Sequence, residues 1–284
     1  MKKVKIKIPA KINLTLDVVG KNDGYHDIKS LVTSVDVFDQ ITVTERKDHR
    51  INLMMSGIPV DVEEENNNAF KTAKLFMEKY STLGVDIKIK KGIPVGAGMG
   101  GSSADVAGVL IAMNRIYDVN ADLKELADSL GSDVAYMLEG GYAVISGRGE
   151  KIAKKDIRKT LYFIILTDKK SVSAKDSYKK FDSIGKNHRQ CTNGAVKALS
   201  DDDFYRFKLM IKNDLLDASA HFSEGIKHNL YVLEMAGAPA KIMTGSGSAV
   251  LGVFESERER NETYRKLEKL YKKAIIKAKT YLSK

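Results

Sequence analysis

A glycine-rich stretch near the middle of the chain constrains the fold more than any other feature. Residues 92–105 are GIPVGAGMGGSSAD, with five glycines and two serines. The preceding segment, VDIKIKK (85–91), alternates apolar and lysine residues, which predicts a strand in a sheet with one solvent-facing side. Residues 102–117 follow as an apolar helix. The fold must therefore contain a strand, a glycine turn and a helix in direct succession.

The remaining segments predict an α+β fold, because strands and helices are mixed without strict βαβ alternation. Period-two alternation predicts half-buried antiparallel strands in the first half, and helical spacing appears first at residues 66–80. The expected strands are 3–8, 12–19, 31–45, 51–56, 85–91, 140–146, 161–166, two joined by a glycine turn within 239–254, and 273–282. The expected further helices are 121–130, 131–138, 173–182, 190–199, 203–212, 223–236 and 256–271. The charged segment 147–160 is the best boundary, which predicts two domains, 1–153 and 154–284.

Composition limits the class of protein. The chain has 284 residues with 43% apolar content, enough for a sizeable core, and a net charge of +10 from lysines spread along its length. A single cysteine, Cys191, leaves no internal disulfide. The first residues alternate lysine with valine and isoleucine, as a strand does, and the apolar run 106–113 is too short to cross a bilayer. We expect a cytoplasmic protein with no membrane partner.

The glycine loop fits a phosphate cradle better than the better-known nucleotide motifs. Gly96 to Gly101 has the spacing G-x-G-x-x-G. The dinucleotide fold also needs a buried parallel strand before this motif and an acid-bearing strand after it, and the sequence predicts neither. A Walker loop requires a lysine directly after its last glycine, and here Gly101 is followed by a serine. Ser102 and Ser103 instead begin a helix, where backbone N–H groups and the helix dipole favour an anion. The structural alternative is a tight strand-to-helix connection with a serine N-cap.

Four stretches carry a resemblance to a known family. PVGAGMGGSSA (94–104) resembles the ATP-binding motif of the GHMP kinase superfamily. PAKINLTLDVVGKNDGYHDIKSL (9–31), GSDVAYMLEGGYAVISGRGE (131–150) and TGSGSAVLGVF (244–254) resemble segments of the 4-diphosphocytidyl-2-C-methyl-D-erythritol kinases within it, in the same order. Met99 stands where that family commonly has leucine. The resemblance implies a two-domain α+β GHMP kinase fold: an N-terminal ATP-binding domain with a mixed sheet and helices, and a C-terminal ferredoxin-like α/β sandwich.

The resemblance also implies roles for residues that bind ATP and perform the chemistry. Asp133 would be the catalytic base, although from the residues alone it could equally be the N-cap of a short helix. Lys11 would lie beside that carboxylate, lower its pKa and offset developing negative charge. Asn67 would border the adenine. The ATP-binding loop would comprise Pro94, Val95, Gly96, Ala97, Gly98, Met99, Gly100, Gly101, Ser102, Ser103 and Ala104.

A third group of residues would bind the phosphate acceptor. By resemblance, Tyr25 would stack on cytosine and His26 would read the edge of the base, with Tyr178 as a second aromatic wall. Asn13 would contact the acceptor, and Gly245 and Gly247 would shape the site near its diphosphate. The histidines form no metal-ligand pattern with the single cysteine, so we predict no protein-bound metal site and Mg²⁺ carried with ATP.

The predicted reaction is ATP-dependent phosphorylation of the 2-hydroxyl of 4-diphosphocytidyl-2-C-methyl-D-erythritol, in non-mevalonate isoprenoid precursor biosynthesis. The predicted partners are this cytidine-diphosphate sugar alcohol and ATP, without nucleic acid, for a monomer or weak homodimer. One alternative is a GHMP kinase for mevalonate or homoserine, which the D-G-Y-H turn at residues 23–26 disfavours because those acceptors carry no base. The other is a non-enzymatic basic protein that binds nucleic acid, suggested only by the positive charge.

Overall fold

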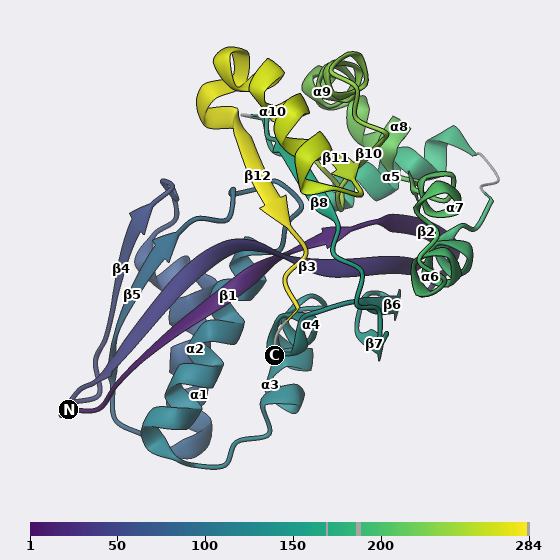
Figure 1. Cartoon of the computed structure of the whole chain (residues 1–284). Helices are drawn as coiled ribbons and strands as arrows, with labels where there is room; N and C mark the ends of the chain where they lie inside the picture. The colour runs from purple at the N-terminus through teal and green to yellow at the C-terminus, as the bar shows by residue number, and fades with distance from the viewer. Residues whose placement is uncertain (169, 186–188, 283–284) are drawn as a thin grey trace. The chain divides into compact units, whose positions relative to one another are not determined.

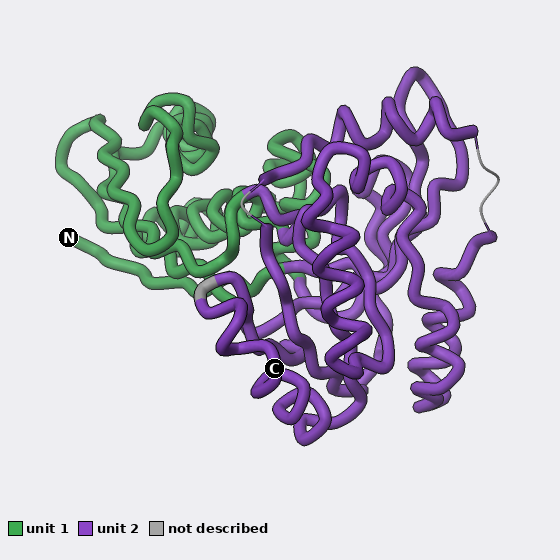
Figure 2. Tube along the Cα trace, turned by 90° about the horizontal axis from the view of Figure 1, so that it is seen from above, with its two compact units in different colours: residues 1–10, 37–95, 100–139 green, residues 11–36, 96–99, 140–284 purple. Residues whose placement is uncertain are grey.

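The structure, a computed structural model, describes residues 1–168, 170–185 and 189–282. The chain forms two compact units (Figure 2). Unit 1 comprises residues 1–10, 37–95 and 100–139, and unit 2 comprises residues 11–36, 96–99 and 140–284. Two long strands, β1 (Lys3–Asn13) and β3 (Tyr25–Glu45), contribute residues to both units. The predicted domain boundary between residues 153 and 154 stays a prediction.

Unit 1 is built on a mixed sheet. Strand β5 (Val85–Lys91) pairs antiparallel with the second half of β3 and parallel with β4 (Ile51–Gly57). The expectation that all strands of the first half are antiparallel was therefore wrong for β4. The reason is the helix α1 (Asn68–Tyr80), which lies between β4 and β5 in the chain and provides the long crossover that a parallel pair needs.

The helices of unit 1 shield the apolar face of this sheet. Helix α2 (Gly101–Tyr117) packs against α1, and its buried residues run almost continuously along the helix. Two shorter helices follow, α3 (Leu123–Leu130) and α4 (Val134–Glu139), and α4 packs against α2. A short 3₁₀ helix, η1 (Glu64–Asn66), precedes α1. The burial on β5 alternates along the strand, as predicted from its sequence.

Unit 2 contains two sets of strands (Figure 1). In the first, β3 pairs antiparallel with β2 (Thr15–Asn22) and β6 (Ala143–Gly147), and β6 pairs with β7 (Lys151–Lys154). Strand β7 lies in the charged segment that was predicted as a domain boundary. The second set is an antiparallel sheet in the order β10-β11-β8-β12, covered by α9 and α10. Its elements are β8 (Tyr162–Leu166), α9 (Glu224–Met235), β10 (Ala240–Met243), β11 (Val250–Phe254), α10 (Glu257–Tyr271) and β12 (Ile275–Lys279).

This second sheet has the strand order and the two helices of a ferredoxin-like sandwich, as the resemblance implied. The segment between β8 and α9 folds as α5 (Ala174–Ile184), α6 (Thr192–Ser200), α7 (Phe204–Lys208), β9 (Lys212–Asn213) and α8 (Leu216–Ala220). A 3₁₀ turn, η2 (Lys272–Ala274), precedes β12. No helix in the described part of the chain has the length and apolar character needed to cross a membrane.

The segment around residues 203–213 differs from its prediction. A helix was expected over 203–212, but α7 ends at Lys208, and the next residues form β9 and then α8. Strand β9 pairs parallel with Thr15 and Leu16 of β2, almost two hundred positions earlier in the chain. This long-range pairing supplies the backbone hydrogen bonds of residues 212–213, so the local helical pattern does not decide their conformation.

Candidate active site

The glycine loop ends at the first turn of α2. Gly100 is the N-cap with φ of +73°, a left-handed conformation that glycine adopts at little cost. No side chain caps α2 in the described structure, so the N-cap serine of the structural alternative is absent. Ser102 and Ser103 lie instead within the first turn, whose N–H groups have no acceptor inside the helix. This helix end is suited to bind an anion.

The start of α1 lies beside the start of α2. Asn68 Nδ2 donates to Ser102 Oγ at 2.8 Å. The preceding residue, Asn67, is buried and is the N-cap of α1, where its Oδ1 accepts from the Ala69 N–H at 2.9 Å. The amide oxygen of Asn67 is thus engaged in capping, and its predicted role near adenine stays a prediction.

A buried ion cluster supports the glycine loop, and the sequence reasoning missed it. We call Asp39, Lys91 and Asp105 the loop-base cluster; all three side chains are almost completely buried. Lys91 Nζ donates to Asp39 Oδ2, to Asp105 Oδ2 at 2.6 Å and to the Gly101 carbonyl at 3.2 Å. Burial raises the pKa of Asp105 to about 7, against the opposing effect of Lys91 and with a further increase from the charge of Asp39.

Asp133 belongs to unit 1 and directly precedes α4. Its carbonyl accepts from the Met137 N–H at 3.1 Å, the first turn of that helix, and its side chain is half-buried. This position agrees with both interpretations that the sequence left open, helix capping and general base. The role of Asp133 as general base therefore stays a prediction.

In unit 2, the segment that contains Lys11 and Asn13 meets the middle of the glycine loop. The Lys11 N–H donates to the Met99 carbonyl at 3.1 Å, and the whole lysine is only 5% exposed. Lys11 is therefore a buried residue and not a solvated surface lysine. Asn13 is also buried, and its Nδ2 donates to Ser30 Oγ at 2.8 Å.

The turn after β10 completes this part of unit 2. Thr244 Oγ1 accepts from the Asn13 N–H at 2.9 Å and donates to the Gly98 carbonyl at 3.3 Å. Gly98 has φ of +72°, and a Cβ there would collide with the Thr244 carbonyl. The structure thus brings together three predicted segments, residues 11–13, 97–99 and 244–247.

Gly245 belongs to the same arrangement. A Cβ on Gly245 would lie 3.0 Å from the Gly98 carbonyl oxygen. Asn213 Nδ2 donates to the carbonyls of Met243 and Gly245, both at 2.8 Å. Within the predicted loop, Ala97 is buried, its carbonyl accepts from the Ala249 N–H at 3.3 Å, and Val95 is exposed.

The residues predicted to recognise cytosine also lie in unit 2. Tyr25 is 59% exposed, and the guanidinium of Arg148 lies 4.1 Å from the centre of its ring. The imidazole of His26 stacks on Tyr178 with ring centres 4.8 Å apart and 16° between the planes. His26 Nε2 lies 2.6 Å from Asp182 Oδ1. The structure therefore joins His26 to Tyr178 and adds Arg148 and Asp182 to this surface.

Asp182 has a second basic neighbour. Lys21 Nζ donates to Asp182 Oδ2 at 2.5 Å, and this hydrogen bond, more than the one from His26, lowers the pKa of Asp182. An ionised Asp182 favours a proton on the His26 Nε2 atom that faces it. The other ring nitrogen, Nδ1, is then the atom through which a neutral His26 can accept a hydrogen bond.

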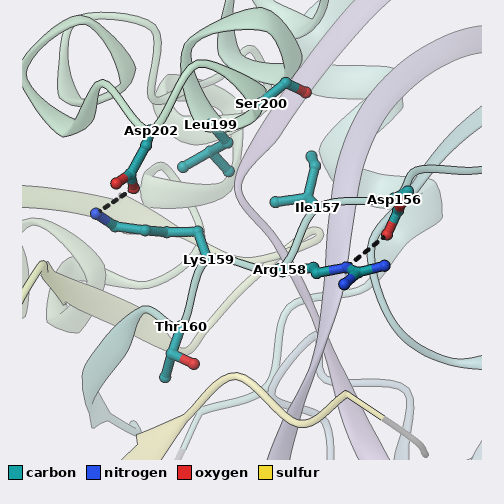
Figure 3. A pocket seen from close by; sticks show the side chains of 8 residues that line it. All are labelled: Asp156, Ile157, Arg158, Lys159, Thr160, Leu199, Ser200 and Asp202. Atoms are coloured by element: carbon teal, nitrogen blue, oxygen red, sulfur yellow. Dashed lines mark hydrogen bonds and ion pairs between the residues drawn. The ribbon is translucent and has the colours of Figure 1, made fainter.

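A polar pocket elsewhere in unit 2 contains none of the predicted site residues (Figure 3). Its volume is about 530 Å³. Lys159 pairs there with Asp202 at 2.6 Å, and Arg158 pairs with Asp156 at 3.3 Å, so both cations already have acidic partners. The lining residues are Asp156, Ile157, Arg158, Lys159, Thr160, Leu199, Ser200 and Asp202.

Sequence reasoning missed several residues of these arrangements: Thr244, Asn213, the three residues of the loop-base cluster, Arg148 and Asp182. Thr244 begins the quoted glycine motif, but its partners Asn13 and Gly98 lie 231 and 146 positions away in the chain. Asn213 carries no local signal. Lys91 did carry a local signal. It is two positions after Ile89, in the series 85, 87, 89 whose residues are apolar, so strand alternation places its side chain on the buried side of β5. In the described ranges, no group of three or more His, Cys, Asp or Glu residues is arranged to hold a metal.

Comparison with known proteins gives the family. The GHMP kinases N terminal domain model matches residues 67–147. A 4-diphosphocytidyl-2-C-methyl-D-erythritol kinase of Clostridium beijerinckii is 36% identical over 279 residues, covering 96% of this chain and 99% of that protein. One from Thermoanaerobacter sp. is 33% identical over 276 residues, covering 95% of this chain and 94% of that protein.

Solved structures agree with this result. A crystal structure of 4-(cytidine 5'-diphospho)-2C-methyl-D-erythritol kinase has a TM-score of 0.83 and 25% identity, covering 99% of this chain and 100% of that one. A crystal structure of L. major mevalonate kinase has a TM-score of 0.76 at 15% identity, covering 99% of this chain and 96% of that one, and shows the shared fold alone. The predicted α+β GHMP kinase fold is confirmed, and the chain belongs to the 4-diphosphocytidyl-2-C-methyl-D-erythritol kinase family of ATP-dependent small-molecule kinases.

Proposed function

We propose that this chain transfers the γ-phosphate of ATP to the 2-hydroxyl of 4-diphosphocytidyl-2-C-methyl-D-erythritol. The names of its relatives supply the substrate. One structural observation supports the proposal most directly: residues 11–13, 97–99 and 244–247 are joined by hydrogen bonds through Thr244. The middle of the loop that would hold the phosphates, a buried lysine and the turn that would face the acceptor thus belong to one arrangement within unit 2.

The glycine loop would hold the phosphates of ATP. Its glycines allow backbone N–H groups to approach the ligand, and the first turn of α2 adds N–H groups and the hydroxyls of Ser102 and Ser103. Asn67 would border the adenine. Mg²⁺ would arrive with the nucleotide, where it neutralises phosphate charge during transfer.

Asp133 and Lys11 would act on the acceptor hydroxyl. This hydroxyl is tertiary, hindered and weakly acidic, so its attack on phosphorus benefits from a base and a nearby cation. We assign proton removal to the Asp133 carboxylate and charge stabilisation to the Lys11 ammonium. Buried Lys11 is suited to this role because a charge in a low-dielectric site interacts more strongly than one in water.

The acceptor's cytosine would bind at the surface of Tyr25, His26 and Tyr178. The exposed ring of Tyr25 can stack on a base, and His26, held by Asp182, can accept a hydrogen bond from an exocyclic amino group at Nδ1. Asn13, Gly245 and Gly247 would lie toward the diphosphate. We further propose that the protein acts in the cytoplasm as a monomer or weak homodimer, with no nucleic-acid or membrane partner.

ADP release by the purified protein tests the reaction. We expect release with 4-diphosphocytidyl-2-C-methyl-D-erythritol and none above background with mevalonate or homoserine. Phosphorus NMR of the product should show a new phosphomonoester on the tertiary carbon. Activity with mevalonate or homoserine instead would establish one of the small-acceptor alternatives. No ADP release with any acceptor, combined with tight binding to nucleic acid, would support the non-enzymatic alternative.

A further inference from the structure

The loop-base cluster connects the two ends of the glycine loop. Asp39 Oδ1 accepts from the N–H groups of Gly92 and Ile93, at 2.7 and 2.9 Å, where the loop begins. Lys91 donates to the Gly101 carbonyl, where the loop ends and α2 begins. Because Lys91 also donates to Asp39, one lysine joins both ends of the loop.

The contact with Gly101 has a directional consequence. A peptide unit is planar and trans, so its carbonyl and the following N–H point in opposite directions. The hydrogen bond from Lys91 holds the Gly101 carbonyl, and it thereby orients the N–H of Ser102 away from the cluster. That N–H is one of the first-turn donors of α2, the group suited to bind a phosphate.

Stability alone is a weak reason for this cluster. Asp39, Lys91 and Asp105 are at most 5% exposed, and removing charges from water costs about as much as such a pair regains. Lys91 also occupies a position on β5 where the strand otherwise places valine and isoleucine. An apolar residue there would pack without any desolvation cost, but it could not reach the Gly101 carbonyl.

We propose that Lys91, held by Asp39 and Asp105, is a positioning residue that fixes the glycine loop in the conformation that binds the nucleotide phosphates. Lys91 acts through the loop and not by touching the nucleotide. This inference rests on the proposed function, in which the loop binds ATP.

The net charge of the cluster is compatible with a loop that binds phosphates when Asp105 is protonated. With both carboxylates ionised, the cluster carries a net charge of −1 at the base of a loop that binds a polyanion. Burial raises the pKa of Asp105 to about 7, so near neutral pH a proton on Asp105 offsets this charge. The oxygen Asp105 Oδ1 is buried and has no hydrogen-bond partner, which makes a charge on this carboxylate costly.

Equilibrium binding of ATP and of adenosine to Lys91→Met tests the proposal. We expect ATP affinity to fall about ten- to hundredfold, the scale of a misplaced binding group, while adenosine affinity stays within twofold of wild type. Hydrogen exchange of residues 94–104 should accelerate in the absence of nucleotide. Equal losses for ATP and adenosine would indicate general damage, and an unchanged ATP affinity would show that the loop needs no support from Lys91; either result overturns the proposal.

Lys159→Met is the matched control. Lys159 also lies between two acids, Asp202 and Glu255, both at 2.6 Å, but it lines the pocket of Figure 3, whose lining residues include none from the glycine loop. We expect this variant to bind ATP as wild type does. An equal loss of ATP affinity in Lys159→Met would also overturn the proposal.

A second variant keeps the test decisive if Lys91→Met does not fold. Asp105→Ala removes one acceptor of Lys91 and leaves the bonds of Asp39 to Gly92 and Ile93 in place. We expect a three- to tenfold loss of ATP affinity, smaller than for Lys91→Met, and partial recovery in Asp105→Asn, which restores an acceptor oxygen. Wild-type ATP affinity in Asp105→Ala would reject the positioning role. If the wild-type protein itself binds no ATP, the proposed function fails first.

Discussion

At the scale of single residues, Asp133 is the position where catalysis and helix capping make different predictions. Asparagine caps a helix as well as aspartate does, so Asp133→Asn should leave α4 and the fold intact. Asparagine cannot accept the hydroxyl proton, and kcat should fall by roughly 10²–10⁴. Steady-state turnover at saturating substrates, together with ATP binding, measures both effects. Asp128→Asn, at an exposed carboxylate on α3, is the control, and near-normal turnover in Asp133→Asn would place the base elsewhere.

Tyr25 tests the recognition of the base. Tyr25→Ala should weaken acceptor binding by about 1–3 kcal/mol, the scale of base–aromatic stacking, and leave the KM for ATP unchanged. Tyr25→Phe should be nearly silent because stacking uses the ring. The guanidinium of Arg148 also lies over the Tyr25 ring, so Tyr25→Ala removes this contact as well. Comparing Tyr25→Ala with wild type in an Arg148→Gln background separates the loss of base stacking from the loss of the arginine contact. An unchanged acceptor KM in Tyr25→Ala would remove Tyr25 from the acceptor site.

Asp105 predicts a pH dependence of stability. Its pKa is raised from 3.8 to about 7 in the folded protein, so the folded state retains a proton that the unfolded chain has released. Between these values the free energy of unfolding should therefore decrease as pH rises, by at most about 1.4 kcal/mol per pH unit, and become level above the folded pKa.

Urea unfolding of wild type and Asp105→Asn at pH 5, 6, 7 and 8 measures this contribution. The stability of Asp105→Asn relative to wild type should increase from pH 5 to pH 7 and then remain constant. Asp128→Asn should show no such increase. Parallel pH profiles for wild type and Asp105→Asn would mean that Asp105 is ionised throughout this range.

At the scale of elements, the glycine loop depends on a close approach to the turn after β10. Gly98→Ala should reduce ATP affinity by roughly ten- to hundredfold, because a Cβ at this position meets the Thr244 carbonyl and displaces the loop. Gly141 is a suitable control, since it also has positive φ, +77°, but an added Cβ has no neighbour within 4 Å. Both variants should lose about 1–2 kcal/mol of stability from the left-handed backbone. Only Gly98→Ala should lose ATP binding, and equal ATP affinities in the two variants would contradict this interpretation.

At the scale of the whole molecule, nucleotide binding should raise the melting temperature. A ligand that binds only the folded state at a hundredfold excess over its Kd contributes about 2.7 kcal/mol. Thermal unfolding with and without MgATP measures this shift. Ser103→Leu, which places a bulky side chain in the first turn of α2, should abolish the shift by ATP and preserve stabilisation by the cytidyl substrate. A full ATP shift in Ser103→Leu would show that the phosphates bind elsewhere.

The sequence by itself determined those features that depend on neighbouring residues. The alternation in β5, the apolar helix α2 and the glycine turn between them follow from local periodicity and from the conformations that glycine allows. The order of the quoted motifs was also sufficient to predict the family and its fold, which the relatives and the solved structures confirm. The residues of the site were predicted too, and their roles stay predictions.

Only the tertiary structure decided the pairings between distant segments. Thr244 contacts Asn13 across 231 positions, β9 pairs with β2, and β4 runs parallel to β5, and no local pattern specifies any of these partners. Lys91 shows the same limit within one strand: its alternation placed it on the buried side, but its partners Asp39 and Asp105 come from β3 and α2. The physical reason is that periodicity fixes which way a side chain points, whereas the chain's long-range packing decides what it meets.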